Sequence, residues 1–162
     1  MVKRVTFSGM MLAAAMIFSY IERLIPLEFI APGVKIGLAN CVFLLCLLTL
    51  GIKEAIFVNL ARIFLTVLLF GNPVSLIFSL SGAVASMAVS ITFFKFFKIS
   101  FSGLGAVSGI THNLAQILAA ALVTGSFAVL WYFPILLISG AVCGFATGAA
   151  AETIAKRVKK YF

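Results

Sequence analysis

Between Lys98 and Glu152 the chain contains no aspartate, glutamate, lysine or arginine. A helix at the surface of a soluble protein needs a polar face, so a soluble domain rarely contains an uncharged stretch of this length. In a bilayer about 20 apolar residues make one spanning helix, and this stretch is long enough for two. His112, Asn113 and Gln116 lie in its middle. Polar groups at that depth face another helix or a cavity rather than lipid.

The whole chain has the composition of an integral membrane protein, because 64% of its residues are hydrophobic and only 10% are charged. With 162 residues it is expected to form a single membrane domain, 1–162. The four acidic residues are all glutamates. An aspartate-rich magnesium site for diphosphate chemistry is therefore excluded, and so is an ATPase with a glycine-rich lysine loop. We expect no enzymatic activity and no cofactor; energy for any transport would come from a partner or from ion coupling.

Charged and turn-forming residues divide the chain into six apolar segments. They predict an all-α bundle of six transmembrane helices, at about 5–21, 36–50, 55–70, 73–94, 101–123 and 127–150. The longest loop, 22–35, contains two glutamates and two prolines. It is predicted either to cover an outward-facing cavity or to rest on the membrane surface.

The distribution of lysine and arginine predicts the orientation of the bundle. Nine of these residues fall on one predicted side: Lys3, Arg4, Lys53, Lys95, Lys98, Lys156, Arg157, Lys159 and Lys160. The other side has Arg23 and Lys35. The positive-inside rule then places both termini in the cytoplasm of a cell (plasma) membrane protein. The positive charge is explained by topology and by attraction to anionic membrane lipid, so no nucleic-acid partner is expected.

Two predicted helices carry polar stripes at a similar depth. Asn59, Arg62 and Thr66 follow helical spacing on one helix, and Arg62 is about 12 Å from either end of it by helical rise. Ser108, His112 and Gln116, with Asn113 beside them, form the stripe of the fifth helix, and Asn40 lies on the second. These residues are the candidate binding site.

A buried arginine needs a partner, because desolvating its charge alone is costly. The sequence places no acidic residue inside a predicted span except Glu54, at the inner end of the same helix as Arg62. The partner is either a set of backbone carbonyls and side-chain amides, or an anionic ligand with Lys35 assisting; we favour the ligand, because a guanidinium pairs with carboxylate or phosphate in two places.

The single histidine, His112, fits hydrogen bonding within the bundle, ligand contact or proton relay. No metal site is expected, since there is no second histidine, no aspartate and no nearby cysteine pair. Small residues at four-residue spacing suggest close helix packing, with Gly140, Gly144 and Gly148 on the last helix. The pair Gly9 and Ala13 on the first helix either packs internally or docks another membrane subunit.

The chain resembles the Gx transporter family, also described as heptaprenyl diphosphate synthase component I. The likeness spans nearly the whole chain. It is carried by Tyr20-Ile21-Glu22, Ile25-Pro26, the run 32–40 from Pro-Gly-Val-Lys to Ala-Asn, Lys53-Glu54-Ala55, Arg62, Phe70-Gly71-Asn72 and His112-Asn113-Leu114-Ala115-Gln116.

That family is similar to the substrate-binding S components of energy-coupling factor (ECF) transporters. The resemblance implies a six-helix subunit that binds a vitamin or related nutrient near the outer face. It also implies docking of the first helix on a membrane coupling subunit that is driven by two ATPase subunits. S components dock through alanine-x-x-x-alanine, whereas this chain has Gly9 and Ala13 at the corresponding positions.

These considerations lead to three hypotheses. The first is an S component for a vitamin- or isoprenoid-related small molecule, anionic or not, bound by Lys35, Asn40, Arg62, His112, Asn113 and Gln116. The second is a non-catalytic membrane anchor for a prenyl diphosphate synthase. The third is a small proton-linked transporter that uses His112.

Overall fold

The computed structural model describes residues 2–24, 37–71 and 73–158, and every regular element in these ranges is a helix. Six α-helices are joined by short connections, with one 3-10 helix before the last of them. In order they are α1 (Val2–Leu24), α2 (Leu38–Thr49), α3 (Ile52–Phe70), α4 (Pro73–Phe96), α5 (Phe101–Thr124), η2 (Phe127–Tyr132) and α6 (Phe133–Val158). The predicted all-α, six-helix membrane bundle is confirmed.

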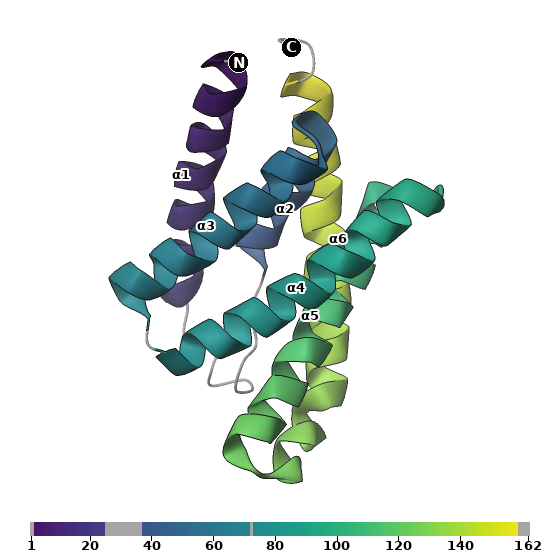
Figure 1. The fold of residues 1–162 in the computed structure, drawn as a ribbon. Coiled ribbons are helices and arrows are strands. Elements are labelled where there is room, and N and C mark those ends of the chain that lie inside the picture. Colours follow the sequence, from purple (N-terminus) through teal and green to yellow (C-terminus); the bar gives the residue numbers. More distant parts are fainter. Residues whose placement is uncertain (1, 25–36, 72, 159–162) are drawn as a thin grey trace.

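The first residues of α1 and the last turns of α6 lie at the same end of the bundle (Figure 1). The turn from α2 to α3 also lies at that end, while α1 ends and α2 begins about level with the middle of α6, and the turn from α5 to α6 forms the opposite end (Figure 1). Within the described residues the first end therefore contains Arg4, Lys53, Lys156 and Arg157. The shared end agrees with an even number of crossings, and the cytoplasmic assignment of that end stays a prediction.

Four segments of the described chain are long and apolar enough to cross a membrane: Arg4–Leu24, Pro73–Phe96, Phe101–Thr124 and Phe127–Val158. This makes the chain a multi-pass membrane protein. α3 is of spanning length, with 19 residues, but carries Lys53, Glu54 and Arg62. α2 has 12 residues, which is about 18 Å of helix against a hydrocarbon core of about 30 Å.

α2 is shorter than the predicted span at 36–50 because glycines bound it on both sides. Gly37 and Gly51 have φ values of +77° and +108°, in the left-handed region that glycine adopts most easily. Between them only Asn40 and Thr49 are polar residues of the helix, and Cys41 to Leu47 are all buried. α2 packs against α1, α3, α5 and α6. It is thus the core helix of the bundle, in keeping with a helix that has no polar face.

α5 and α6 pack more closely than any side chain at the contact would permit. A Cβ added to Gly105 would lie 2.1 Å from the Gly144 carbonyl oxygen, and one added to Gly109 would lie 2.2 Å from the carbonyl oxygen of Gly140. These contacts are backbone against backbone. The predicted glycine stripe therefore closes the bundle internally, as small residues do between membrane helices.

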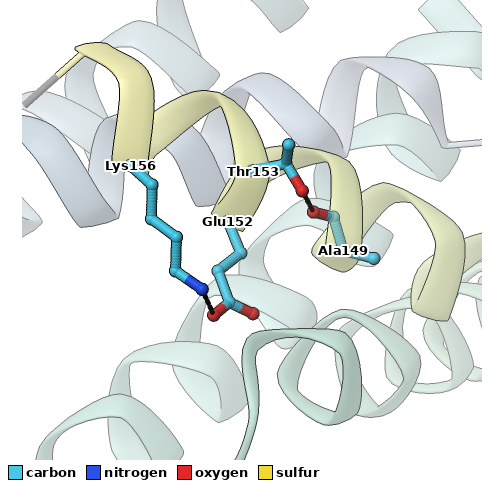
Figure 2. A network of polar contacts seen from close by, with 4 residues as sticks. All are labelled: Ala149, Glu152, Thr153 and Lys156. Carbon is cyan, nitrogen blue, oxygen red and sulfur yellow. Dashed lines mark hydrogen bonds and ion pairs between the residues drawn. The ribbon is translucent and has the colours of Figure 1, made fainter.

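α6 begins and ends later than the predicted segment 127–150. Residues 127–132 form the separate 3-10 helix η2, and α6 starts at Phe133 with Pro134 in its first turn, where a missing N–H costs no hydrogen bond. At the other end the helix continues to Val158. Figure 2 shows this last part, in which Lys156 pairs with Glu152 at 2.7 Å, one turn earlier. Thr153 donates to the Ala149 carbonyl at 2.9 Å.

Candidate functional site

The guanidinium of Arg62 is held between α1 and α3 by neutral oxygens. Nε and Nη2 donate to Asn59 Oδ1 at 3.3 and 2.9 Å, and Nη1 donates to Ser19 Oγ at 3.2 Å. Asn59 is buried and Arg62 is partly buried. One turn further along α3, Thr66 donates to the sulfur of Met16 at 3.4 Å, so the polar stripe predicted for this helix faces α1. Of the partners predicted for Arg62, the structure thus contains a side-chain amide, that of Asn59.

Three of the five guanidinium N–H groups are used in these bonds, counted among the described residues. One N–H on each terminal nitrogen is left. Two N–H groups on adjacent nitrogens form the fork that binds carboxylate or phosphate in two places. Asn59 and Ser19 orient this fork and carry no charge of their own.

Glu22 is the acidic residue that the sequence analysis did not connect with Arg62. The prediction placed it in the loop 22–35, but α1 continues to Leu24 and Glu22 lies in its last turns. The Gly37 N–H, at the start of α2, donates to Glu22 Oε1. The carboxylate also interacts electrostatically with Arg62 on α3 and with the Cys143 side chain on α6. The carboxylate is thus hydrogen-bonded to the start of α2.

The sequence did contain a signal for this arrangement. Ser19 and Glu22 are three residues apart, so on a helix they share one face, and Arg62 lacked a counter-charge. The other acidic candidate, Glu54, is used elsewhere. It pairs with Arg4 at 3.6 Å, at the end of the bundle where α1 begins. We call Ser19, Glu22, Asn59 and Arg62, with the Gly37 N–H, the charged cluster.

Asn40 connects α2 to the polar stripe of α5. It lies one turn after Gly37 and donates from Nδ2 to Ser108 Oγ at 3.0 Å. Ser108 is fully buried. Because Glu22 binds Gly37 and Asn40 binds Ser108, the start of α2 lies between the charged cluster and α5.

His112 and Gln116 pack directly on the backbone of α4. A Cβ on Gly82 would come within 2.8 Å of both Gln116 Cγ and His112 Cε1, so only glycine leaves room for them here. Gln116 is buried, and its Oε1 accepts no hydrogen bond from the described atoms. An orphaned buried amide oxygen is costly unless a donor reaches it.

Asn113 points to a different helix from the rest of the predicted site. Its Nδ2 donates to the Leu136 carbonyl of α6 at 2.7 Å, and the residue is buried. Here it ties α5 to α6 next to the glycine contact. Lys35, the remaining predicted site residue, and most of the loop 22–35 lie outside the described residues.

One pair of small residues on the first helix is uncovered. Gly9 and Ala13 are exposed, and a Cβ on Gly9 would meet no atom within 4 Å. Val5 and Ile17, one turn before and after this pair, are 72% and 58% exposed. Of the two interpretations for this stripe, internal packing is wrong for Gly9, and docking of another subunit stays a prediction.

An open apolar hollow of about 250 Å³ lies at the start of the last helix, lined by Phe127, Leu130, Trp131, Phe133 and Pro134. Trp131 is 86% exposed. The described residues contain no group of three histidine, cysteine or acidic side chains placed to hold a metal ion.

Comparison with known proteins gives one family. The family model described as heptaprenyl diphosphate synthase component I matches residues 11–154. No curated protein and no solved structure matches the chain significantly. The matched range includes every described residue of the charged cluster and of the α4–α5 contact.

Proposed function

The chain belongs to the heptaprenyl diphosphate synthase component I family, and on this premise we propose that it is a solute-binding membrane subunit. Its ligand is a vitamin- or isoprenoid-related small molecule with an anionic group. The subunit acts as the S component of an ECF-type importer and has no chemical step of its own. The word component in the family description names one part of an assembly, which fits a protein that works with others.

The proposal rests on the guanidinium of Arg62, which has hydrogen-bond donors left unused among the described residues. A guanidinium away from bulk water keeps its charge at a high cost in desolvation unless it is paired. Asn59 and Ser19 offset part of this cost through hydrogen bonds, yet they leave two N–H groups unused among the described residues. A carboxylate or phosphate fills both at once and supplies the opposite charge. The fork is thus pre-oriented for an anion.

The other site residues supply neutral contacts in this proposal. Asn40 of α2 binds Ser108 of α5, and Gln116 offers an acceptor that no described group satisfies. His112 lies against α4 beside it. A ligand could place its anion on the Arg62 fork and donate from a hydroxyl or amide to Gln116. It would then contact the polar residues of both α3 and α5. Asn113 is assigned to the helix contact with α6 rather than to the ligand.

Delivery of the ligand requires a partner. Gly9 and Ala13, exposed on α1, are proposed to dock a membrane coupling subunit that works with two ATPase subunits. The flanking Val5 and Ile17 are exposed as well and would extend the contact along one face of the helix.

The proposal is tested by mass spectrometry of small molecules retained by the detergent-purified protein. Wild type is compared with Arg62→Ala and with Arg157→Ala, which removes an exposed arginine at the far end of α6. We expect wild type and Arg157→Ala to retain the same anionic compound and Arg62→Ala to lose it. If wild type retains nothing and Arg62→Ala still supports transport in cells, the proposal fails.

The family description favours a second candidate, a non-catalytic membrane anchor for a prenyl diphosphate synthase. Co-purification separates the two. An S component brings down a coupling subunit and ATPases, whereas an anchor brings down a soluble synthase. Uptake driven by a proton gradient without any ATPase would instead support the proton-linked transporter.

A further inference from the structure

The charged cluster contains a negative charge as well as a positive one, and the two do not form an ion pair. The ion pairs of the described chain are Arg4–Glu54 and Glu152–Lys156, so the carboxylate of Glu22 and the guanidinium of Arg62 are not in direct contact. They are nevertheless close enough to interact electrostatically. Ser19, one turn before Glu22 on α1, already binds Arg62 at 3.2 Å, so both groups face the same α1–α3 junction.

Each of the two charged groups has hydrogen-bonding capacity left. Glu22 Oε1 accepts the Gly37 N–H, and in the described part of the chain Oε2 has no donor. Arg62 has one unused N–H on each terminal nitrogen, as counted above. Among the described residues, Glu22 Oε2 and two N–H groups of Arg62 therefore lack hydrogen-bond partners at the α1–α3 junction, and they do not bond to each other.

The carboxylate of Glu22 affects which ligand charges Arg62 can accept. A simple anion at the fork would place a second negative charge near Glu22. Two negative charges repel each other more strongly away from water than in it. A ligand with a cationic group beside its anion avoids this repulsion and gives Glu22 Oε2 a donor. If Glu22 served only to neutralise Arg62, direct contact would do so best, yet its hydrogen bond goes to the start of α2 instead.

We propose that the ligand of this site is zwitterionic, with its anionic group on the Arg62 fork and an ammonium or similar cationic donor on Glu22. The inference rests on the proposed solute-binding function and deepens it. Glu22 is then a specificity residue: it rejects plain anions that Arg62 alone would accept. Such rejection by an opposing charge is a common source of selectivity.

The test compares three small probes. O-phosphoethanolamine and ethyl phosphate are of similar size and differ by the ammonium group, and ethylamine carries only the cation. Dissociation constants are measured on the full-length protein in detergent from the shift of the thermal unfolding midpoint with probe concentration. The proteins are wild type, Glu22→Gln and Glu152→Gln. Glutamine keeps an acceptor for the Gly37 N–H, so Glu22→Gln removes the charge and not the hydrogen bond. Glu152→Gln removes an equal charge at the other end of the bundle, where Glu152 pairs with Lys156.

For wild type and Glu152→Gln we expect O-phosphoethanolamine to bind about tenfold tighter than ethyl phosphate, from one additional charge-assisted bond. For Glu22→Gln we expect the order to reverse. If ethyl phosphate binds wild type as tightly as the zwitterion, this inference is overturned while an anion site at Arg62 stands. If no probe binds wild type and it retains no small molecule, both proposals fall. Arg62→Ala should bind neither O-phosphoethanolamine nor ethyl phosphate. This loss would show that both probes bind at Arg62.

Discussion

Arg62 on α3 donates a hydrogen bond to Ser19 on α1 over 3.2 Å, and the carboxylate of Glu22 lies one helical turn beyond Ser19. This relationship brings Ser19 and Glu22, two polar residues near the end of α1, to the side of α1 that meets Arg62. Arg62, which has no counter-charge on its own helix nearby, thus has an acidic residue of α1 in its electrostatic environment. The predictions below follow from this junction and from the helix contacts that hold it in place.

Asn59→Leu should destabilise the bundle more than Ser19→Ala. Asn59 accepts two hydrogen bonds from Arg62, whereas Ser19 accepts one. Loss of hydrogen bonds to a charged group costs about 1.5–3 kcal/mol, so we expect a loss near the upper value for Asn59→Leu and near the lower one for Ser19→Ala. Reversible unfolding in mixed detergent micelles measures both. Equal stability of Asn59→Leu and wild type would show that Arg62 does not depend on this amide.

Gly105→Ala should separate α5 from α6. The new methyl group would lie 2.1 Å from the Gly144 carbonyl oxygen, and backbone cannot move aside as a flexible side chain can. Overpacking of this kind costs about 1–3 kcal/mol or more, and we expect a lower unfolding midpoint together with loss of retained ligand. Gly9→Ala is the matched control, because a Cβ there meets nothing within 4 Å.

Gly82→Ala should impair ligand binding more than folding. Its Cβ would collide with Gln116 Cγ and His112 Cε1, which belong to side chains and can shift. We expect the two side chains to be displaced and the affinity for the retained ligand to fall about tenfold, roughly the value of one or two misplaced hydrogen bonds. Titration of the purified protein with the compound identified by mass spectrometry gives the ratio. Unchanged affinity would remove this part of the α4–α5 contact from the site.

Asn113→Leu should lower stability and leave ligand selectivity unchanged. The side chain donates to the Leu136 carbonyl at 2.7 Å, and that carbonyl also accepts from Ser139 at 3.2 Å, so loss of the Asn113 bond should cost about 0.5–1.5 kcal/mol. The preference between O-phosphoethanolamine and ethyl phosphate serves as the readout of selectivity. A changed preference would return Asn113 to the ligand contacts predicted from the sequence.

Gly9→Leu should weaken assembly without affecting the fold. The position is open in this chain, so a larger side chain is tolerated here, but it would block the close approach of a second helix. We expect wild-type thermal stability and a several-fold lower recovery of the coupling subunit in co-purification. Undiminished recovery would place the docking surface elsewhere.

Much of the fold could be predicted because it depends on patterns within single segments. The uncharged stretch predicted α5 and α6, and the glycine spacing predicted the smooth face through which they pack. Polar spacing also identified the stripe of Asn59, Arg62 and Thr66. The length of α2 was overestimated at 36–50, since hydropathy continues across Gly37 while the helix begins at Leu38 and ends at Thr49.

The candidate site was harder to predict, because periodicity identifies the polar face of a helix and not the helix that it meets. Asn113 and Gln116 are three residues apart, yet one donates to α6 and the other packs on α4. Glu22 was assigned to a loop because its neighbours are turn-forming, and one further turn of α1 brings it to the same junction as Arg62.

By itself the sequence determined that this is an all-helical membrane protein, which segments are helical, and which polar residues are kept away from water. Those properties follow from hydrophobic length and from the cost of exposing polar groups to lipid, and both are local to a segment. Only the tertiary structure decided that Arg62 is held by Ser19 and Asn59, that the Glu22 carboxylate accepts a hydrogen bond from the start of α2, and that Gly9 is left uncovered. Such pairings depend on how the helices cross, and crossing is set by the side chains of both partners together.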